Sequence, residues 1–260
     1  MIIIEIQQLI NDYKSEYALA PGIAVAINKG GVVYKKSYGM SNIENQVKIN
    51  SKTNFYIASV SKTFTASAIM LLRDKGLVNI NDSIREYFPD LQDYYKDIKI
   101  INLINHTSGL RDYFKVFLDK DILNGVTNEK VYHYIKTNNM IEFHIGTKFQ
   151  YSNTGYVLLA MLVEKVSGVS FSQFLSHEIF KPLNMKSTFV NSPLQPIIPN
   201  KAYAYKEIDN VNYCDDHLIL TTGDGGIYSN IEDLLLWSQV FNNDKLSSGG
   251  VIEEIFSTKI

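Results

Sequence analysis

Ser59 and Lys62, a serine and a lysine three residues apart, are the side chains of this sequence best spaced for covalent chemistry. Apolar residues recur at helical spacing from Val60 onward and Gly76 supplies a stop, so both side chains are expected on one face where a buried helix begins. A serine hydroxyl needs a neighbour that takes its proton, and a lysine in a partly dry pocket at the positive end of a helix could share that task. The same pattern also fits a serine N-cap followed by a solvent-facing lysine.

A second candidate set is Tyr151-Ser152-Asn153, which precedes a strongly apolar helix predicted over 156–166. A tyrosine whose ionised form is stabilised by a lysine cation can act as general base toward a serine and then as acid toward a leaving group. An asparagine can hold the lysine or donate to a substrate carbonyl. Alternatively, Tyr151 packs on the core and Asn153 serves as a helix cap.

The third candidate is the glycine-rich segment Gly223-Asp224-Gly225-Gly226. Glycines there either let the backbone approach a ligand closely, which makes Gly225 and Gly226 candidate substrate-binding residues, or simply form a tight turn before a capped helix. The sequence favours the turn. A phosphate-binding loop is disfavoured, because no lysine follows at the required spacing.

The elements that must position these residues follow from hydrophobic periodicity. An amphipathic helix is predicted over 5–17, a β-hairpin over 23–27 and 32–38, and mostly helices from 75 to about 185. Weak strands are predicted at 187–190 and 202–208. A capping box over 229–232 is predicted to open a helix at 233–241, and another helix begins within 251–260.

These elements predict one domain over 1–260, with an α/β part from about 1–74 and 186–260 and an inserted helical subdomain from about 75–185. The fold class is α/β (α+β), with an antiparallel sheet flanked by helices. A hairpin needs further strands or a covering helix to be stable. Few good strands follow it, so we expect the sheet to be incomplete.

Composition places the protein among ordinary globular chains. Of 260 residues, 45% are hydrophobic and 20% charged, and the net charge of −2 gives no reason to expect nucleic acid. The one cysteine, Cys214, excludes an internal disulfide. No apolar run has the length of a membrane span and the first residues make no convincing signal peptide, so a cytoplasmic location is expected. The five histidines lack zinc-site spacing, and Cys214-Asp215-Asp216-His217 has no second ligand cluster, so neither a metal nor a cofactor is expected.

Taken together and in this order, Ser59-Val60-Ser61-Lys62, Tyr151-Ser152-Asn153 and Gly223-Asp224-Gly225-Gly226 resemble the motifs of the penicillin-recognising serine hydrolases. The nearest branch holds class C β-lactamases, D,D-carboxypeptidases and related esterases. Two further segments, 105–110 and 180–185, support the resemblance. It implies a β-lactamase/transpeptidase-like fold in which Ser59 is the acylated nucleophile, Lys62 its proton partner, Tyr151 the general base and Asn153 the contact to Lys62 and substrate.

One departure from the family pattern concerns the carboxyl-terminal strand. The family's Lys/His-Thr/x-Gly triad does not occur after Gly226. In the family that strand lines the cleft and donates the second N–H of the oxyanion hole, the first being that of Ser59. Loss of one such donor costs on the order of 10²–10³ in rate. The sequence is therefore expected to be a family member truncated before its last strands and final helix.

Three hypotheses follow. The first is a serine hydrolase that acts through a Ser59 acyl-enzyme on a small ester, amide, peptide or lactam. The second is a catalytically weak or inactive penicillin-binding-type protein that captures acyl-like ligands without efficient turnover. The third is self-association, in which another copy pairs with the incomplete sheet edge.

Overall fold

The amino-terminal residues form the helix and hairpin that the sequence predicts. The computed structural model describes residues 2–16, 22–29, 31–117, 125–191, 197–216 and 220–243, and helix α1 spans Ile2–Glu16. Strands β1 (Gly22–Lys29) and β2 (Val32–Asn42) are antiparallel, and they pair along the whole of β1. The short strand β3 (Val47–Lys48) joins on the far side of β2, which gives the order β1-β2-β3.

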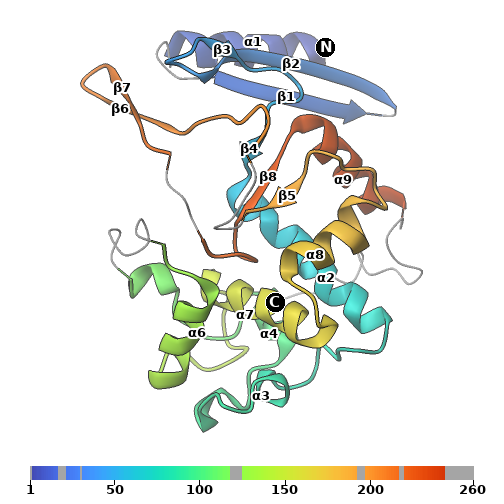
Figure 1. Cartoon of the computed structure of the whole chain (residues 1–260), viewed down its shortest axis with the longest axis vertical. Helices are drawn as coiled ribbons and strands as arrows, with labels where there is room; N and C mark the ends of the chain where they lie inside the picture. The colour runs from blue at the N-terminus through green and yellow to red at the C-terminus, as the bar shows by residue number, and fades with distance from the viewer. Residues whose placement is uncertain are drawn as a thin grey trace.

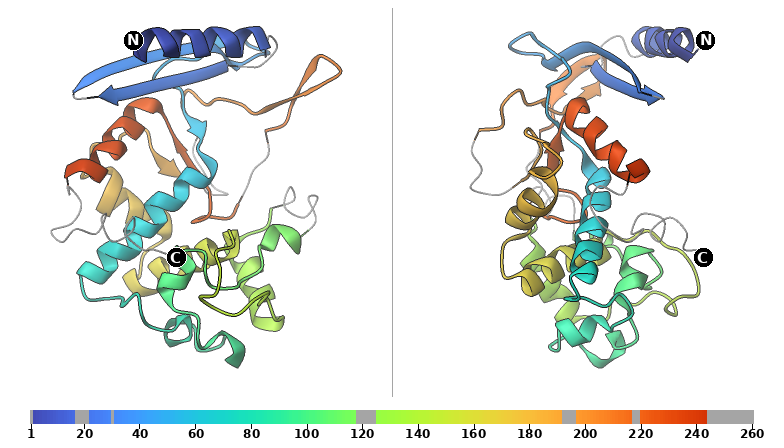
Figure 2. Two further views of the ribbon diagram at one scale, coloured as in Figure 1. Left: turned by 180° about the vertical axis from the view of Figure 1, so that it is seen from behind. Right: turned by 90° about the vertical axis from the view of Figure 1, so that its right-hand side faces the viewer.

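Two helices cover this small sheet. In Figure 1, α1 lies above the hairpin and α9 (Ile231–Asn243) below it, and the side view in Figure 2 shows the same order. Helix α9 contacts β1 directly, and the hydroxyl of Tyr34 in β2 donates to Gln7 Oε1 of α1 at 3.4 Å. The hairpin therefore does not stand alone: α9 packs against β1, and α1 is joined to β2 by this hydrogen bond.

A second sheet links the hairpin to the helices. It consists of β4 (Phe55–Tyr56), β8 (Ile227–Ser229) and β5 (Phe189–Val190) in the order β4-β8-β5, all antiparallel. Only the β5 segment is predicted from the sequence. Strands of two or three residues are too short for periodicity to show. A third pair, β6 (Tyr205–Ile208) and β7 (Val211–Cys214), projects from the body as a hairpin (Figure 1).

The helical part is built on two long helices, α2 (Ser61–Asp74) and α7 (Asn153–Ser167), which pack against each other. Helix α7 is apolar on most of its surface because other helices surround it, and Gly168 ends it with φ 74° as the sequence predicts. The shorter elements are η1 (Ala58–Val60), α3 (Ile84–Tyr87), η2 (Asp93–Tyr95), α4 (Ile100–Ile104), η3 (Tyr113–Lys115), α6 (Asn128–Thr137), α8 (Phe171–Leu175) and the π-helical turn η4 (Ser176–Phe180).

The cap of α9 differs from the prediction. The helix begins at Ile231, two residues before the predicted start at 233, and its cap is Asn230 rather than Ser229. Asn230 Oδ1 accepts from the backbone N–H groups of Glu232 at 3.1 Å and Asp233 at 3.0 Å. Ser229 cannot cap the helix because it belongs to β8, where its hydroxyl hydrogen-bonds that of Thr188 at 2.7 Å.

The fold class is confirmed: antiparallel sheets are flanked by helices, and the intervening residues are mostly helical. The boundaries near 75 and 185 stay predictions. The helix expected within 251–260 and the residue His217 lie outside the described residues. No single helix of the described ranges is long and apolar enough to cross a membrane, although the bent pair Asn153–Ser167 and Phe171–Phe180 passes on length and composition together.

Candidate active site

Ser59 lies in the 3₁₀ turn η1, directly before α2. The turn is fixed on the β4 side, where the N–H of Ile57 donates to the carbonyl of Ile227 at 2.9 Å. The preceding residue, Ala58, has φ 45°, a left-handed conformation that is uncommon for a residue with a side chain. Such strain persists only where the surrounding structure enforces it, and it often marks functional positions. The expectation that Ser59 lies next to the amino terminus of the helix is confirmed.

Lys62 is buried and makes three hydrogen bonds through its Nζ atom. The side chain lies one turn after Ser59 and the residue is 6% exposed. Nζ donates to Ser59 Oγ at 3.2 Å, to Asn153 Oδ1 at 2.7 Å and to the backbone carbonyl of Asp224 at 2.5 Å. An ammonium group has three protons to donate, so these three acceptors match its charged form.

Tyr151 is placed over the same two residues. Its hydroxyl is 2.6 Å from Ser59 Oγ, and Lys62 Nζ lies 4.8 Å from the centre of its ring. The residue is 42% exposed, so the phenol can be reached from solvent. Ser59 Oγ therefore has hydrogen-bond contacts to two groups able to exchange a proton with it.

Asn153, the first residue of α7, is held from behind by Asp112. One carboxylate oxygen, Asp112 Oδ2, accepts from the Asn153 backbone N–H at 3.0 Å and from its Nδ2 at 2.8 Å. This leaves Asn153 Oδ1 directed at Lys62. The carboxamide orientation thus follows from the hydrogen-bond network: its nitrogen faces an acceptor and its oxygen faces a donor.

His106 supports Tyr151 from a turn in which it adopts φ 57°. Its Nδ1 accepts from the backbone N–H of Ser152 at 3.2 Å, and its ring lies 4.6 Å from that of Tyr151. Burial, and then the positive charge of Lys62, lower the pKa of His106 to about 4. The imidazole is therefore neutral at pH 7 and acts as a packed hydrogen-bond acceptor.

The glycine segment packs closely against β4. A Cβ on Gly225 would lie 2.4 Å from the hydroxyl oxygen of Tyr56, and the N–H of Gly226 donates to that oxygen at 3.1 Å. Gly226 has φ 83°. These contacts explain both glycines structurally, in agreement with the favoured interpretation of a tight turn. Their role as substrate-binding residues stays a prediction.

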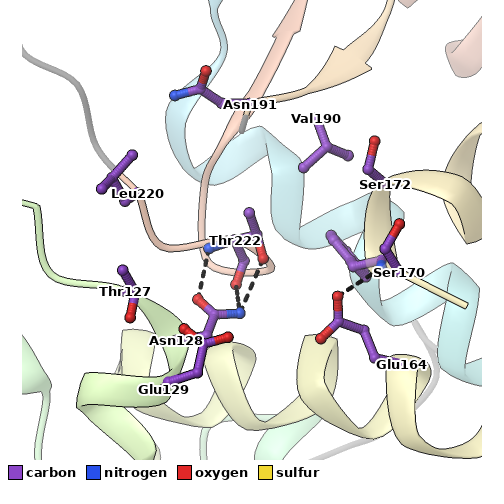
Figure 3. Close-up of a pocket in the computed structure, with 11 residues that line it drawn as sticks. Thr127, Asn128, Glu129, Glu164, Ser170, Ser172, Val190, Asn191, Leu220 and Thr222 are labelled. Atoms are coloured by element: carbon purple, nitrogen blue, oxygen red, sulfur yellow. Dashed lines mark hydrogen bonds between the residues drawn. The ribbon is translucent and has the colours of Figure 1, made fainter. Parts of the chain in front are cut away.

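A cavity of about 250 Å³ lies beside Leu220 and Thr222, which precede the glycine segment (Figure 3). Asn128 and Thr222 meet there through three hydrogen bonds of 2.9–3.3 Å, and Glu164 Oε1 accepts from the N–H of Phe171 at 2.8 Å. Asn128 thus anchors the backbone two residues before Asp224, whose carbonyl holds Lys62.

Within the described ranges, no group of three or more His, Cys, Asp and Glu side chains is placed to hold a metal ion. Cys214 is exposed at the end of β7. The proton-transfer chemistry that Ser59, Lys62 and Tyr151 can perform requires no metal.

Several groups around the site carry no recognisable signal in the sequence: Tyr56, Asp112, Tyr113 and the side chain of Asp224. Asp112 and Tyr113 follow 105–110, a segment that supports the family resemblance, but their partners are 41 to 111 residues away. Asp224 lies inside the glycine segment, where its carboxyl gives no spacing signal.

Known proteins share the sequence pattern of this chain. The family model described as Beta-lactamase matches residues 6–258. Penicillin-binding protein 4* of Bacillus subtilis (strain 168) is 32% identical over 91% of this chain and 55% of its own length. The chain spans about half the length of the curated relatives it matches.

Two solved structures share the fold. An octameric penicillin-binding protein homologue from Pyrococcus abyssi has a TM-score of 0.82 and 26% identity, over 97% of this chain and 59% of the other. The D-amino acid amidase of Ochrobactrum anthropi SV3, complexed with L-phenylalanine amide, also has a TM-score of 0.82, with 24% identity over 96% of this chain and 72% of the other. The amidase likeness concerns the fold alone.

Proposed function

The chain belongs to the beta-lactamase family, and on that premise we propose that it is a serine hydrolase acting through an acyl-enzyme on Ser59. The observation that carries the proposal is the convergence on Ser59 Oγ of Tyr151, at 2.6 Å, and Lys62, at 3.2 Å. These residues lie 92 and three positions away along the chain, so the fold is needed to bring them together.

In the proposed reaction, Ser59 Oγ attacks the carbonyl carbon of an ester, amide, peptide or lactam. Its proton passes to an ionised Tyr151, whose negative charge the ammonium group of Lys62 stabilises. The bond to the leaving group then breaks, and Tyr151 returns the proton to that group. A water molecule hydrolyses the resulting ester and regenerates Ser59.

Asn153 has two tasks in this scheme. Its Oδ1 accepts from Lys62 Nζ at 2.7 Å and so fixes the lysine, and its carboxamide is proposed to contact the substrate. Small amides, esters and lactams are the substrate classes to examine first, because each carries a carbonyl carbon that Ser59 can attack.

The alternative is a protein that is acylated but turns over poorly. The two hypotheses differ in the lifetime of the acyl-enzyme, which is longer where the oxyanion hole has fewer N–H donors. Self-association through the edge of β1 remains a further proposal, to be tested by sedimentation at several concentrations.

Intact-mass spectrometry after incubation with a fluorophosphonate, and separately with a penicillin, tests the proposal. We expect one adduct on the parent protein and none on Ser59→Ala. Labelling of Ser59→Ala to the same extent would refute Ser59 as the nucleophile. A lactam adduct that persists for hours would favour the poorly turning-over alternative over the hydrolase.

A further inference from the structure

Asp224 is a buried carboxylic acid beside Lys62 that the proposed reaction does not use. The residue is 5% exposed, and its Oδ2 accepts from the hydroxyl of Tyr113 at 2.8 Å. Its Oδ1 is buried without a hydrogen-bond partner among the residues that the structure describes. Burying such a group is costly unless it is neutral or a positive charge lies nearby.

Lys62 supplies that positive charge. Burial raises the pKa of Asp224 to about 6, and the charge of Lys62 opposes the rise. Because the interaction acts equally on both partners, an ionised Asp224 also stabilises the ammonium form of Lys62. At pH 7, above the pKa of its carboxyl, Asp224 is mostly ionised.

The other titratable groups around this pair cannot replace the negative charge of Asp224. Tyr113 and Tyr56 face the carboxyl, and burial raises the pKa of both, that of Tyr56 to about 12, so both are neutral at pH 7. The groups that face Lys62 are Tyr151 and Tyr156 through their rings, the neutral His106, and Asp112, which acts through Asn153.

We propose that Asp224 is a positioning residue that keeps Lys62 charged and in place. Its carboxylate provides the buried counter-charge, and its backbone carbonyl fixes Nζ between Ser59 and Asn153. The inference rests on the proposed function, in which a charged Lys62 stabilises the ionised Tyr151. It adds a residue whose side chain touches neither the serine nor the tyrosine.

The test is the pH dependence of fluorophosphonate labelling, with Asp224→Asn beside the parent. In this reaction Ser59 Oγ bonds to phosphorus, fluoride leaves, and the serine proton passes to Tyr151. We expect the alkaline limb of the labelling profile to move to lower pH in Asp224→Asn, because the buried counter-charge beside Lys62 is gone. Tyr113→Phe is the matched control: it removes a hydrogen bond to the same carboxylate but keeps the charge, so its alkaline limb should stay near that of the parent.

The outcomes separate a failure of the proposed function from a failure of the role proposed for Asp224. A parent that is not labelled at Ser59 at any pH refutes the proposed function and the inference with it. If the parent is labelled and its alkaline limb coincides with that of Asp224→Asn, the role proposed for Asp224 is wrong and the proposed function stands.

If Asp224→Asn does not fold, a reciprocal measurement replaces it. The carboxyl ¹³C signal of Asp224 is titrated in the parent and in Lys62→Met. Loss of the lysine charge should raise the titration midpoint of Asp224, and an unchanged midpoint would overturn the inference.

Discussion

Replacing Asp112 by asparagine tests whether Asn153 must be held from behind for Lys62 to be placed correctly. Asp112 is 9% exposed, and its Oδ1 accepts from the N–H of Phe114 at 3.0 Å while Oδ2 accepts twice from Asn153. An asparagine has one acceptor oxygen and one NH₂ group in the same shape. Whichever way its amide is turned, NH₂ therefore faces an N–H group and at least one hydrogen bond is lost.

The size of the effect follows from these contacts. A hydrogen bond to a charged group contributes roughly 1.5–3 kcal/mol, and the buried donor left behind adds a desolvation cost. We expect Asp112→Asn to lower the free energy of unfolding by about 2–4 kcal/mol. Asn153 would shift, Lys62 would lose its 2.7 Å acceptor, and acylation of Ser59 should slow on the order of 10²-fold, as for displacements of about 1 Å.

Asp233 offers a matched control. It is 6% exposed, and its Oδ2 accepts from the N–H of Ser187 and the hydroxyl of Thr188, both at 2.8 Å, in the first turn of α9. Asp233→Asn should lose comparable stability in urea unfolding but keep the labelling rate of the parent. If Asp112→Asn also labels at the parent rate, Asp112 serves stability only and our reasoning is wrong.

Two further predictions concern His106 and Gly225. Because the pKa of His106 in the folded state, about 4, lies below its ordinary value of 6.5, the unfolded chain takes up that proton first, and stability falls as the pH drops from about 6.5 to about 4. His106→Asn should lessen this fall in urea midpoints measured across that range, and an undiminished fall would contradict the assignment. Gly225→Ala places a Cβ 2.4 Å from the Tyr56 hydroxyl oxygen, so we expect a loss of about 1–3 kcal/mol in the free energy of unfolding. Adding Tyr56→Phe should recover part of that loss, whereas two purely additive losses would show that the hydroxyl is not what the new methyl meets.

Much of the scaffold could be predicted because it depends on neighbours in the sequence. The apolar spacing after Val60 predicts α2, and the apolar run before Gly168 predicts α7. The turn residues at 28–31, between two strand-like segments, predict the hairpin. The placement of Ser59 and Lys62 follows from the same rule, since residues three apart on a helix share a face.

Other features could not be predicted in this way. Strands β4 and β8 hold together only because Phe55 meets Ser229 and Tyr56 meets Tyr228, partners far apart in the sequence. The same pairing takes Ser229 away from the predicted helix cap and leaves that task to Asn230. Strands of two or three residues are too short to show a periodic pattern, so the local sequence does not predict them.

By itself, the sequence determined which residues could do chemistry and that Lys62 lies one turn after Ser59, where a helix begins. Only the tertiary structure decided what surrounds them: Asp112 behind Asn153, and Asp224 between Lys62 and Tyr113. The physical reason is that helical spacing is a local property of the chain. A buried charge, by contrast, is tolerated only where partners from distant segments satisfy it, and which partners meet is fixed by the packing of the whole core.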